Sequence, residues 1–308
     1  MEKEIEDRLV DFLKANKEKP IYIIWFGGEP LLCFDVMLSI SQRIKAEGID
    51  YSSSMITNGS LLTPNIIAQL TELNLTFIQI SMDGIKEDHD KRRFFKGGKP
   101  SFDIIMNNIK CLLDTTNIPL TIQVTTDKTN ASGYENLINY CKVHFSTYYD
   151  NKRLQIGVNR VQNRTGFDVD NKCFSSEDLY QRTLANISKC DCFESKCKHL
   201  PHKSLACGYR SPNTLSIDAK GYIYPCLEYL GNPTKSLGSL IDNKISISKI
   251  KQCAFQYNPF EDEECKKCPV LPLCGGGCPK DYEKPNVKEI RCTMYKEYLS
   301  KLLYELAK

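Results

Sequence analysis

The chain has 308 residues, and its 41% apolar content is enough to bury a core in one large domain or two smaller ones. Lysine and arginine (41) nearly balance aspartate and glutamate (38), and the net charge of +3 argues against a dedicated nucleic-acid-binding protein. No apolar run reaches the roughly 18 residues of a membrane span, and the charged first twenty residues do not fit a signal peptide. We therefore expect a cytoplasmic protein without nucleic-acid or membrane partners.

The N-terminal part alternates helical and strand-like patterns. Residues 3–16 have helical periodicity, and so do 32–46, 64–73 and 102–113. Strands alternating with helices predict a parallel α/β sheet. The expected strands are 21–26, 53–56, 77–80, 120–124 and 154–158.

Polar or glycine residues follow each expected strand, where parallel sheets usually carry their functional groups. Such residues are also common in ordinary turns, so a single strand end is a weak signal and five together are a stronger one. The strand ends are Gly27-Gly28-Glu29, Thr57-Asn58-Gly59, Ser81-Met82-Asp83-Gly84, Thr125-Thr126-Asp127 and Asn159-Arg160.

The composition changes near residue 185, where we place a domain boundary between residues 1–185 and 186–308. Glycine, proline and cysteine become dense beyond it, until a closing helix over 293–307. Such a segment buries little apolar surface and typically needs a metal to hold it. Within the first domain, the charged stretch 86–99 predicts a loop.

Fifteen cysteines are unevenly placed, four before residue 190 and eleven in the last 119 residues. Without an export signal, clustered thiols indicate metal binding rather than disulfides. Soft thiolates select zinc or iron–sulfur clusters. The irregular spacing favours iron–sulfur, with structural zinc as the alternative. The pattern is Cys207-x13-Gly221-x4-Cys226, then Cys265-x2-Cys268-x5-Cys274-x3-Cys278, then Cys292 thirteen residues later.

This seven-cysteine pattern resembles the SPASM domain of radical SAM enzymes. The resemblance implies two auxiliary 4Fe–4S clusters, one held by Cys207, Cys226 and Cys278. The other would be held by Cys265, Cys268, Cys274 and Cys292. For an eighth ligand the candidate is Cys197, with Cys192 and Cys190 behind it, or an open iron site that binds substrate.

The N-terminal half resembles the same family. The sequence Gly27-Gly28-Glu29-Pro30 looks like the family's GGEP motif, and Thr57-Asn58-Gly59, Ser81-x-Asp83-Gly84, His89-Asp90 and Arg93 follow at the family's intervals. Many relatives carry an R-x-N pair on the next strand, near the ribose or carboxylate of S-adenosylmethionine. This chain has Gln123 and Thr125 at those positions, and Gln123 can donate a hydrogen bond there but carries no charge. The resemblance implies that S-adenosylmethionine contacts Gly27, Gly28, Glu29, Pro30, Thr57, Asn58, Ser81, Asp83 and Gln123.

The family's C-x3-C-x2-C motif, which binds the catalytic 4Fe–4S cluster, does not occur in this sequence. The resemblance places it some tens of residues before GGEP, so the implied fold is a partial (β/α)6 barrel that lacks its first strand. We expect the catalytic cluster in a longer chain, of which this one is an N-terminally truncated form. The alternative is a naturally cluster-deficient protein that acts as a binding partner or scaffold.

The resemblance implies an oxidoreductase that matures a ribosomally made peptide or protein. Hydrogen abstraction by a 5′-deoxyadenosyl radical would be the key step, with flavodoxin or ferredoxin as reductant. Anaerobic sulfatase-maturating enzymes are an alternative, but they carry a catalytic aspartate directly after the cysteine matching Cys226. Here that residue is Leu227, and Glu228 comes one position later, more in keeping with a solvated loop carboxylate. The sequence names no catalytic acid or base.

Overall fold

The structure is a computed structural model that describes residues 1–17, 20–161, 172–188, 207–242, 244–246, 249, 258–280 and 295–307. The chain divides into two compact units, Lys3–Cys173 and Phe174–Lys308, with Met1 grouped in the first and Glu2 in the second. This division lies earlier in the chain than the boundary expected near residue 185. Helix α8 (Ser176–Ile187) belongs to the second unit because it packs against α13 (Tyr295–Ala307), with the Tyr180 and Tyr298 rings stacked 4.5 Å apart.

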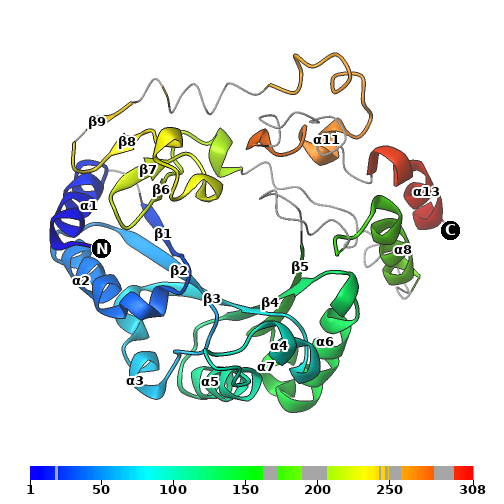
Figure 1. The fold of residues 1–308 in the computed structure, drawn as a ribbon, viewed down its shortest axis with the longest axis horizontal. Helices are drawn as coiled ribbons and strands as arrows, with labels where there is room; N and C mark the ends of the chain where they lie inside the picture. The colour runs from blue at the N-terminus through cyan, green and yellow to red at the C-terminus, as the bar shows by residue number, and fades with distance from the viewer. Residues whose placement is uncertain are drawn as a thin grey trace. The chain divides into compact units, whose positions relative to one another are not determined.

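A five-stranded parallel sheet organises the N-terminal unit, with its strands in sequence order (Figure 1). This confirms the α/β class and the five predicted strands. Because each strand pairs in parallel with the next, all five carboxyl ends lie along one edge of the sheet. The strands are β1 (Ile21–Trp25), β2 (Tyr51–Thr57), β3 (Leu75–Met82), β4 (Leu120–Thr126) and β5 (Leu154–Arg160).

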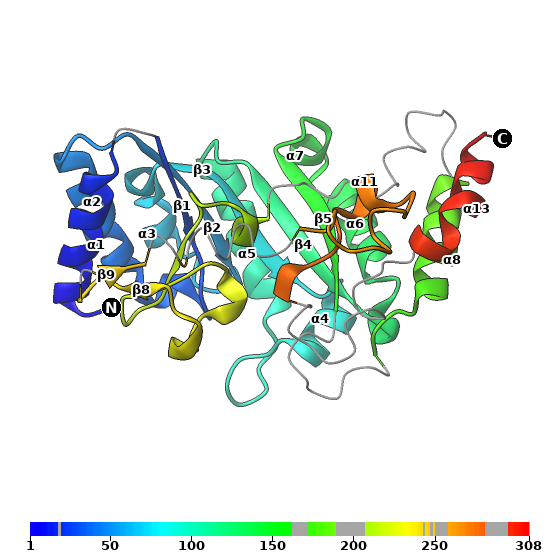
Figure 2. The ribbon, with the colours of Figure 1, turned by 90° about the horizontal axis from the view of Figure 1, so that it is seen from above.

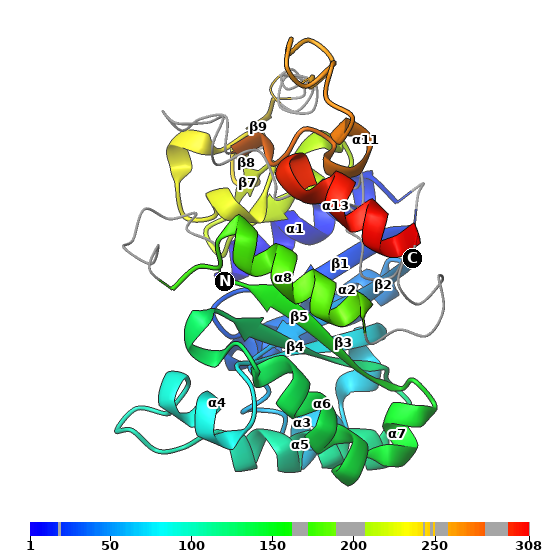
Figure 3. The same cartoon turned by 90° about the vertical axis from the view of Figure 1, so that its right-hand side faces the viewer.

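One face of the sheet is packed against helices, and Figures 1 and 3 show α5 and α6 on that side. Alternate side chains of β4, Leu120, Ile122 and Val124, are buried in this core, while Gln123 and its alternate neighbours point to the other face. The described helices of this unit are α1 (Lys3–Ala15), η1 (Pro30–Cys33), α2 (Phe34–Ala46), α3 (Pro64–Ile67), η2 (Leu70–Leu73), α4 (Lys86–Arg92), α5 (Phe102–Thr115), η3 (Lys128–Asn130), α6 (Gly133–His144) and α7 (Ser146–Asp150).

The loop predicted over 86–99 is wrong in its first half, because Lys86–Arg92 forms α4. An ion pair between Lys86 and Asp90, one helical turn apart at 3.3 Å, supports the helix. The buried side chain of His89 also holds the helix in place, through hydrogen bonds with the Asp83 backbone and Ser101. The charges therefore line a short helix, and only the following residues turn back through a bridge between Phe94 and Pro100.

The C-terminal unit combines short elements with one helix pair. Figures 2 and 3 show α8 beside α13. The segment before Cys226 forms the antiparallel pair β6 and β7. No helix among the described residues is long and apolar enough to cross a membrane. The short elements are η4 (Gly208–Arg210), β6 (Ser216–Ile217), β7 (Tyr222–Tyr224), η5 (Leu227–Tyr229), η6 (Pro233–Lys235), β8 (Gly238–Ser239), β9 (Lys244–Ile245) and α11 (Leu271–Cys274).

Candidate functional site

Glu29 connects the ends of the first two strands. Its Oε1 accepts hydrogen bonds from Thr57 Oγ1 at 2.7 Å and from the Leu31 backbone N–H at 3.1 Å. Its Oε2 accepts a bond from the Asn58 backbone N–H at 2.8 Å. Three donors thus fix the carboxylate, so Glu29 joins the expected site residues Thr57 and Asn58 into one hydrogen-bonded corner. A carboxylate held in this way is a rigid anionic group at the carboxyl edge of the sheet.

Gly27 and Gly28 leave open space beside the main chain. A Cβ atom built on either residue would meet no other atom within 4 Å, and neither residue has a left-handed φ. Neither backbone conformation nor crowding by the protein therefore requires glycine here. The next residue, Pro30, begins η1, a position suited to its fixed φ. The open strip next to Glu29 fits a ligand that approaches the backbone closely.

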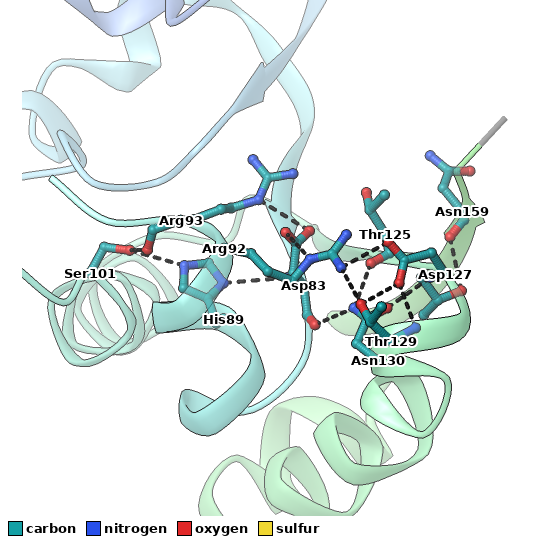
Figure 4. Close-up of polar contacts among 11 residues, drawn as sticks. Asp83, His89, Arg92, Arg93, Ser101, Thr125, Asp127, Thr129, Asn130 and Asn159 are labelled. Atoms are coloured by element: carbon teal, nitrogen blue, oxygen red, sulfur yellow. Dashed lines mark hydrogen bonds and ion pairs between the residues drawn. The ribbon is translucent and has the colours of Figure 1, made fainter. Parts of the chain in front are cut away.

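Asp83, directly after β3, is buried in a cluster of charges (Figure 4). Its Oδ2 lies 3.1 Å from Arg92 Nε, and its Oδ1 lies 3.1 Å from Arg93 Nε. Arg92 also reaches across to the strand end of β4, where its Nη1 lies 2.9 Å from Asp127 Oδ2. Asp83 thus forms ion pairs with two arginines, and one of them, Arg92, links the residues that follow β3 and β4.

The charges of this cluster stabilise one another. Burial lowers the pKa of Arg92, but hydrogen bonds to Asp127 and Asp83 outweigh it, so that the pKa is raised. For Asp127, burial raises the pKa, and hydrogen bonds from Thr129 and Arg92 outweigh this and lower it. Sequence reasoning missed Arg92 and Asp127 as partners. The available signal was the presence of acids at two neighbouring strand ends, which need a shared cation when buried.

His89 is a buried neutral side chain. Its Nδ1 accepts a hydrogen bond from the Asp83 backbone N–H at 3.3 Å, and its Nε2 lies 3.0 Å from Ser101 Oγ. Because Ser101 Oγ donates its proton to the Arg93 carbonyl at 2.8 Å, the Nε2 of His89 must be the donor to Ser101. Burial lowers the pKa of His89 to about 4. The imidazole positions the β3–α4 turn, and it is uncharged near neutral pH.

Ser81 and Gln123 are neighbours on the face of the sheet opposite the helices. They are paired in register between β3 and β4, and Gln123 is paired with Gly157 on β5. A Cβ atom on Gly157 would lie only 2.5 Å from Gln123 Oε1, so the Gln123 amide lies across β5 where glycine leaves room. The structure therefore places an uncharged hydrogen-bonding group beside Ser81.

Cys207, Cys226 and Cys278 lie within electrostatic range of one another. Burial is the largest cause that raises the pKa of the Cys226 thiol, and the neighbouring thiols of Cys207 and Cys278 raise it further. The backbone N–H of Glu228 acts in the opposite direction. These three cysteines are the set that the family resemblance assigns to one auxiliary cluster.

Cys265, Cys268 and Cys274 lie in a second half-buried segment that ends in a glycine turn. The Gly276 backbone N–H donates to Cys274 Sγ at 3.3 Å. Left-handed φ angles of 54° to 86° at Gly275, Gly276 and Gly277 allow that turn. Thiols with backbone N–H donors fit iron–sulfur ligation. Cys190, Cys192, Cys197 and Cys292 lie outside the described residues.

Among the described residues, none of the ten cysteines forms a disulfide. No group of three histidine, cysteine, aspartate or glutamate side chains in the described ranges is arranged to hold a single metal ion.

Glu228 is engaged in an ion pair rather than solvated. Its Oε2 lies 3.2 Å from Lys280 Nζ, which also donates to the Glu228 carbonyl at 3.0 Å. Leu227, which directly follows Cys226, is exposed and apolar. Lys280 was not singled out by sequence reasoning, since 52 residues separate it from Glu228.

Comparison with known proteins agrees with this geometry. Residues 1–127 match the radical SAM superfamily. A cysteine-type anaerobic sulfatase-maturating enzyme of Clostridium novyi is 22% identical over 91% of this chain and 80% of its own length. The radical SAM cyclopropyl synthase TigE of Paramaledivibacter caminithermalis is 27% identical over 97% of this chain and 63% of its own length.

The fold is also that of a solved relative. The structure described as native anSMEcpe with bound AdoMet has a TM-score of 0.69 and 18% identity, covering all of this chain and 90% of that one. The chain is thus similar over most of its length to anaerobic sulfatase-maturating enzymes, and its first 127 residues match the radical SAM superfamily. S-adenosylmethionine and iron–sulfur clusters are the cofactors of that superfamily, and its members among these relatives are enzymes.

Proposed function

We propose that this protein is a radical SAM maturase that modifies a ribosomally made peptide or protein. The observation that carries the proposal is the corner at the carboxyl ends of β1 and β2. There an open strip of backbone at Gly27 and Gly28 adjoins a carboxylate held by three hydrogen bonds. When bound, S-adenosylmethionine and a reduced 4Fe–4S cluster would supply a 5′-deoxyadenosyl radical able to remove a hydrogen atom from the peptide.

The residues of the N-terminal unit would bind and orient S-adenosylmethionine. The backbone at Gly27, Gly28 and Pro30 would take up its methionine part, with Glu29 supplying negative charge near the ammonium group. Thr57 and Asn58 hold Glu29 in place. Ser81 and Gln123 would offer neutral hydrogen bonds along the sheet, and Asp83 would act through the turn that it builds with Arg92 and Arg93.

The C-terminal unit would hold two auxiliary 4Fe–4S clusters. One would use Cys207, Cys226 and Cys278, with Cys197 as candidate eighth ligand and Cys192, Cys190 or an open iron site as alternatives. The other would use Cys265, Cys268, Cys274 and Cys292. Thiolate ligands and the Gly276 N–H bond to Cys274 Sγ support the assignment. A flavodoxin or ferredoxin would serve as reductant.

The test uses the complete open reading frame that contains this sequence, because the 308 residues include no C-x3-C-x2-C motif. The protein is purified without oxygen, reconstituted with iron and sulfide, and mixed with S-adenosylmethionine and reduced flavodoxin. We expect 5′-deoxyadenosine in the product mixture, and a mass change in a peptide encoded next to the gene when the two are co-expressed. Iron uptake without 5′-deoxyadenosine would favour the alternative of a cluster-deficient scaffold.

The same assay includes Gly28→Ala and, as a control for backbone strain, Gly48→Ala. Gly48 also has open space around it, but its φ of 64° disfavours alanine, and it lies in the turn between α2 and the amino end of β2, away from the carboxyl ends of the strands. We expect Gly28→Ala to weaken S-adenosylmethionine binding by about tenfold or more, because the added methyl group occupies the strip. Equal affinity in Gly28→Ala and the wild type would contradict the placement of the ligand.

Sulfatase maturation is the second candidate, favoured by the similarity to sulfatase-maturating enzymes over most of the chain. Leu227 speaks against it, because it stands where those enzymes have an aspartate. A synthetic sulfatase peptide containing the target cysteine or serine separates the two readings. Oxidation of that side chain would establish the sulfatase activity, and an unchanged peptide would leave the peptide-maturase proposal in place.

A further inference from the structure

Three thiol-bearing segments of the C-terminal unit are tied together by side chains that lie just beyond each cysteine. The segments carry Cys207, Cys226 and Cys278, and long stretches of chain separate them. Two basic side chains make the ties. Arg210 links the segment of Cys207 to that of Cys278, and Lys280 links the segment of Cys278 to that of Cys226.

Arg210 ties the first segment to the third. Its backbone N–H donates to the Cys207 carbonyl at 2.9 Å, so that η4 begins directly after the cysteine. The Arg210 guanidinium then donates through Nη2 to the Gly277 carbonyl at 3.2 Å. Gly277 directly precedes Cys278, so this bond sets the distance between the main chains of Cys207 and Cys278.

Lys280 ties the third segment to the second. It lies two residues after Cys278, and Glu228 lies two residues after Cys226. Lys280 Nζ contacts both the Glu228 carboxylate, at 3.2 Å, and the Glu228 carbonyl, at 3.0 Å. Only 21% of the Lys280 side chain and 26% of the Glu228 side chain are exposed. An ion pair of such low exposure is less screened than a surface pair, and the carbonyl contact fixes the main chain as well.

An aromatic ring lies beside the contact between Lys280 and Glu228. Lys280 Nζ lies 5.4 Å from the centre of the buried Tyr229 ring, which follows Glu228. The Tyr209 ring, beside Arg210, lies 6.1 Å from the same ring. The Tyr229 ring therefore helps to hold Lys280 near Glu228, and its contact with Tyr209 joins the segments of Cys226 and Cys207.

We infer that Arg210 and Lys280 are positioning residues that hold Cys207, Cys226 and Cys278 ready to receive an iron–sulfur cluster. The inference rests on the cluster assignment of the proposed function. It assigns Glu228 a structural task, as the anionic partner of Lys280. Groups that orient metal ligands from outside the ligand set typically change metal affinity by about 10- to 100-fold.

The experiment measures how fast reconstituted protein loses iron to a chelator, with no activity assay involved. We compare the wild type with Lys280→Ala, Arg210→Met and the conservative variant Lys280→Arg. Lys220→Ala is the control, since Lys220 is an exposed lysine in the turn between β6 and β7. We expect about tenfold faster iron loss in Lys280→Ala and in Arg210→Met, and wild-type loss in Lys220→Ala.

Lys280→Arg separates positioning from general structural damage. It keeps a cation that can donate to both the Glu228 carboxylate and the Glu228 carbonyl, so its rate of iron loss should lie closer to the wild type than to Lys280→Ala. Iron loss at the wild-type rate in both Lys280→Ala and Arg210→Met would overturn the inference. So would a Lys280→Arg variant that loses iron as fast as Lys280→Ala. A wild type that takes up no iron would instead refute the cluster assignment itself.

A variant that fails to fold is recognised before iron is added. Far-ultraviolet circular dichroism of the iron-free proteins should be the same for the wild type and every variant. Where Arg210→Met fails this check, Arg210→Lys replaces it, because a lysine keeps the charge and can reach the same carbonyl without the planar fork. Slower iron loss in Arg210→Lys than in Lys280→Ala is then the expected result.

Discussion

At the scale of single residues, His89 shows how burial sets a charge state. The imidazole accepts from the Asp83 N–H and donates to Ser101, and burial lowers its pKa to about 4 from the ordinary value of 6.5. The folded protein therefore holds His89 in its neutral form down to about pH 4. The unfolded chain binds a proton here between pH 6.5 and 4, whereas the folded chain does not.

The sign of the pH dependence follows from that difference. The contribution of His89 to stability is fully present above pH 6.5 and is lost as the pH falls toward 4, about 3 kcal/mol in total. The free energy of unfolding can be followed by the fluorescence of Trp25, the only tryptophan in the chain, which lies in β1. We expect the loss between pH 6.5 and 4 to be smaller by this amount in His89→Leu.

His144→Gln serves as the control, because His144 lies at the end of α6 and outside this network. It should keep the pH dependence of the wild type. An identical loss of stability in His89→Leu and the wild type over the same pH range would show that the imidazole is not held neutral.

Glu29 illustrates how a motif residue gains a second task from its surroundings. The GGEP motif predicted that Glu29 contacts S-adenosylmethionine. In the structure, Glu29 also accepts bonds from Leu31, Thr57 and Asn58, so the carboxylate that would face a ligand is aligned beforehand. Alignment of this kind reduces the ordering that binding must otherwise impose.

At the scale of elements, Arg92 places helix α4 against two strand ends. Its guanidinium bridges Asp83 after β3 and Asp127 after β4, and both carboxylates are nearly inaccessible to solvent. Removing the shared cation would leave two buried acids short of their partner. Arg92 therefore joins α4 to both strand ends at once.

Arg92→Met is expected to reduce the free energy of unfolding by about 3 kcal/mol, because an uncompensated buried charge is costly. Arg92→Lys should lose less, since a lysine can reach one of the two carboxylates. The control is Lys45→Met, which breaks an exposed pair with Glu72 and should cost under about 1 kcal/mol. Trp25 fluorescence during urea unfolding measures all three, and an Arg92→Met variant as stable as Lys45→Met would refute the bridge.

At the scale of the whole molecule, the two units differ in what holds them together. The N-terminal unit has a continuous core of aliphatic side chains between sheet and helices. The described part of the C-terminal unit has strands of two or three residues and a small cluster around Tyr180 and Leu302. A segment with so little buried apolar surface depends on its ligands for stability.

Iron removal should therefore affect the two units differently. In protein reconstituted with the proposed clusters, we expect iron removal to increase amide hydrogen exchange at least about tenfold across residues 207–280 and to leave it unchanged in β2 to β4. Mass spectrometry of peptic fragments gives both values in one sample. Equal exchange in 207–280 with and without iron would show that the clusters do not stabilise this unit.

The sequence by itself determined the α/β class, the five strands and the candidate strand ends. These depend on local periodicity and on glycine and polar residues close in the chain, as at Gly27 to Glu29. Cysteine spacing likewise pointed to metal chemistry, because ligands in one loop must be near in sequence. Charge alone misled at Lys86–Arg92, where a helix replaced the expected loop.

Only the tertiary structure decided which partners these residues take. Glu29 meets Asn58 across 29 positions, Arg92 meets Asp127 across 35, and Lys280 meets Glu228 across 52. Such pairings arise when the strands align and the loops fold back, and no local pattern encodes them. A buried charge must find an opposite charge wherever the fold brings one, so its partner is a property of the packed chain and not of the residues beside it.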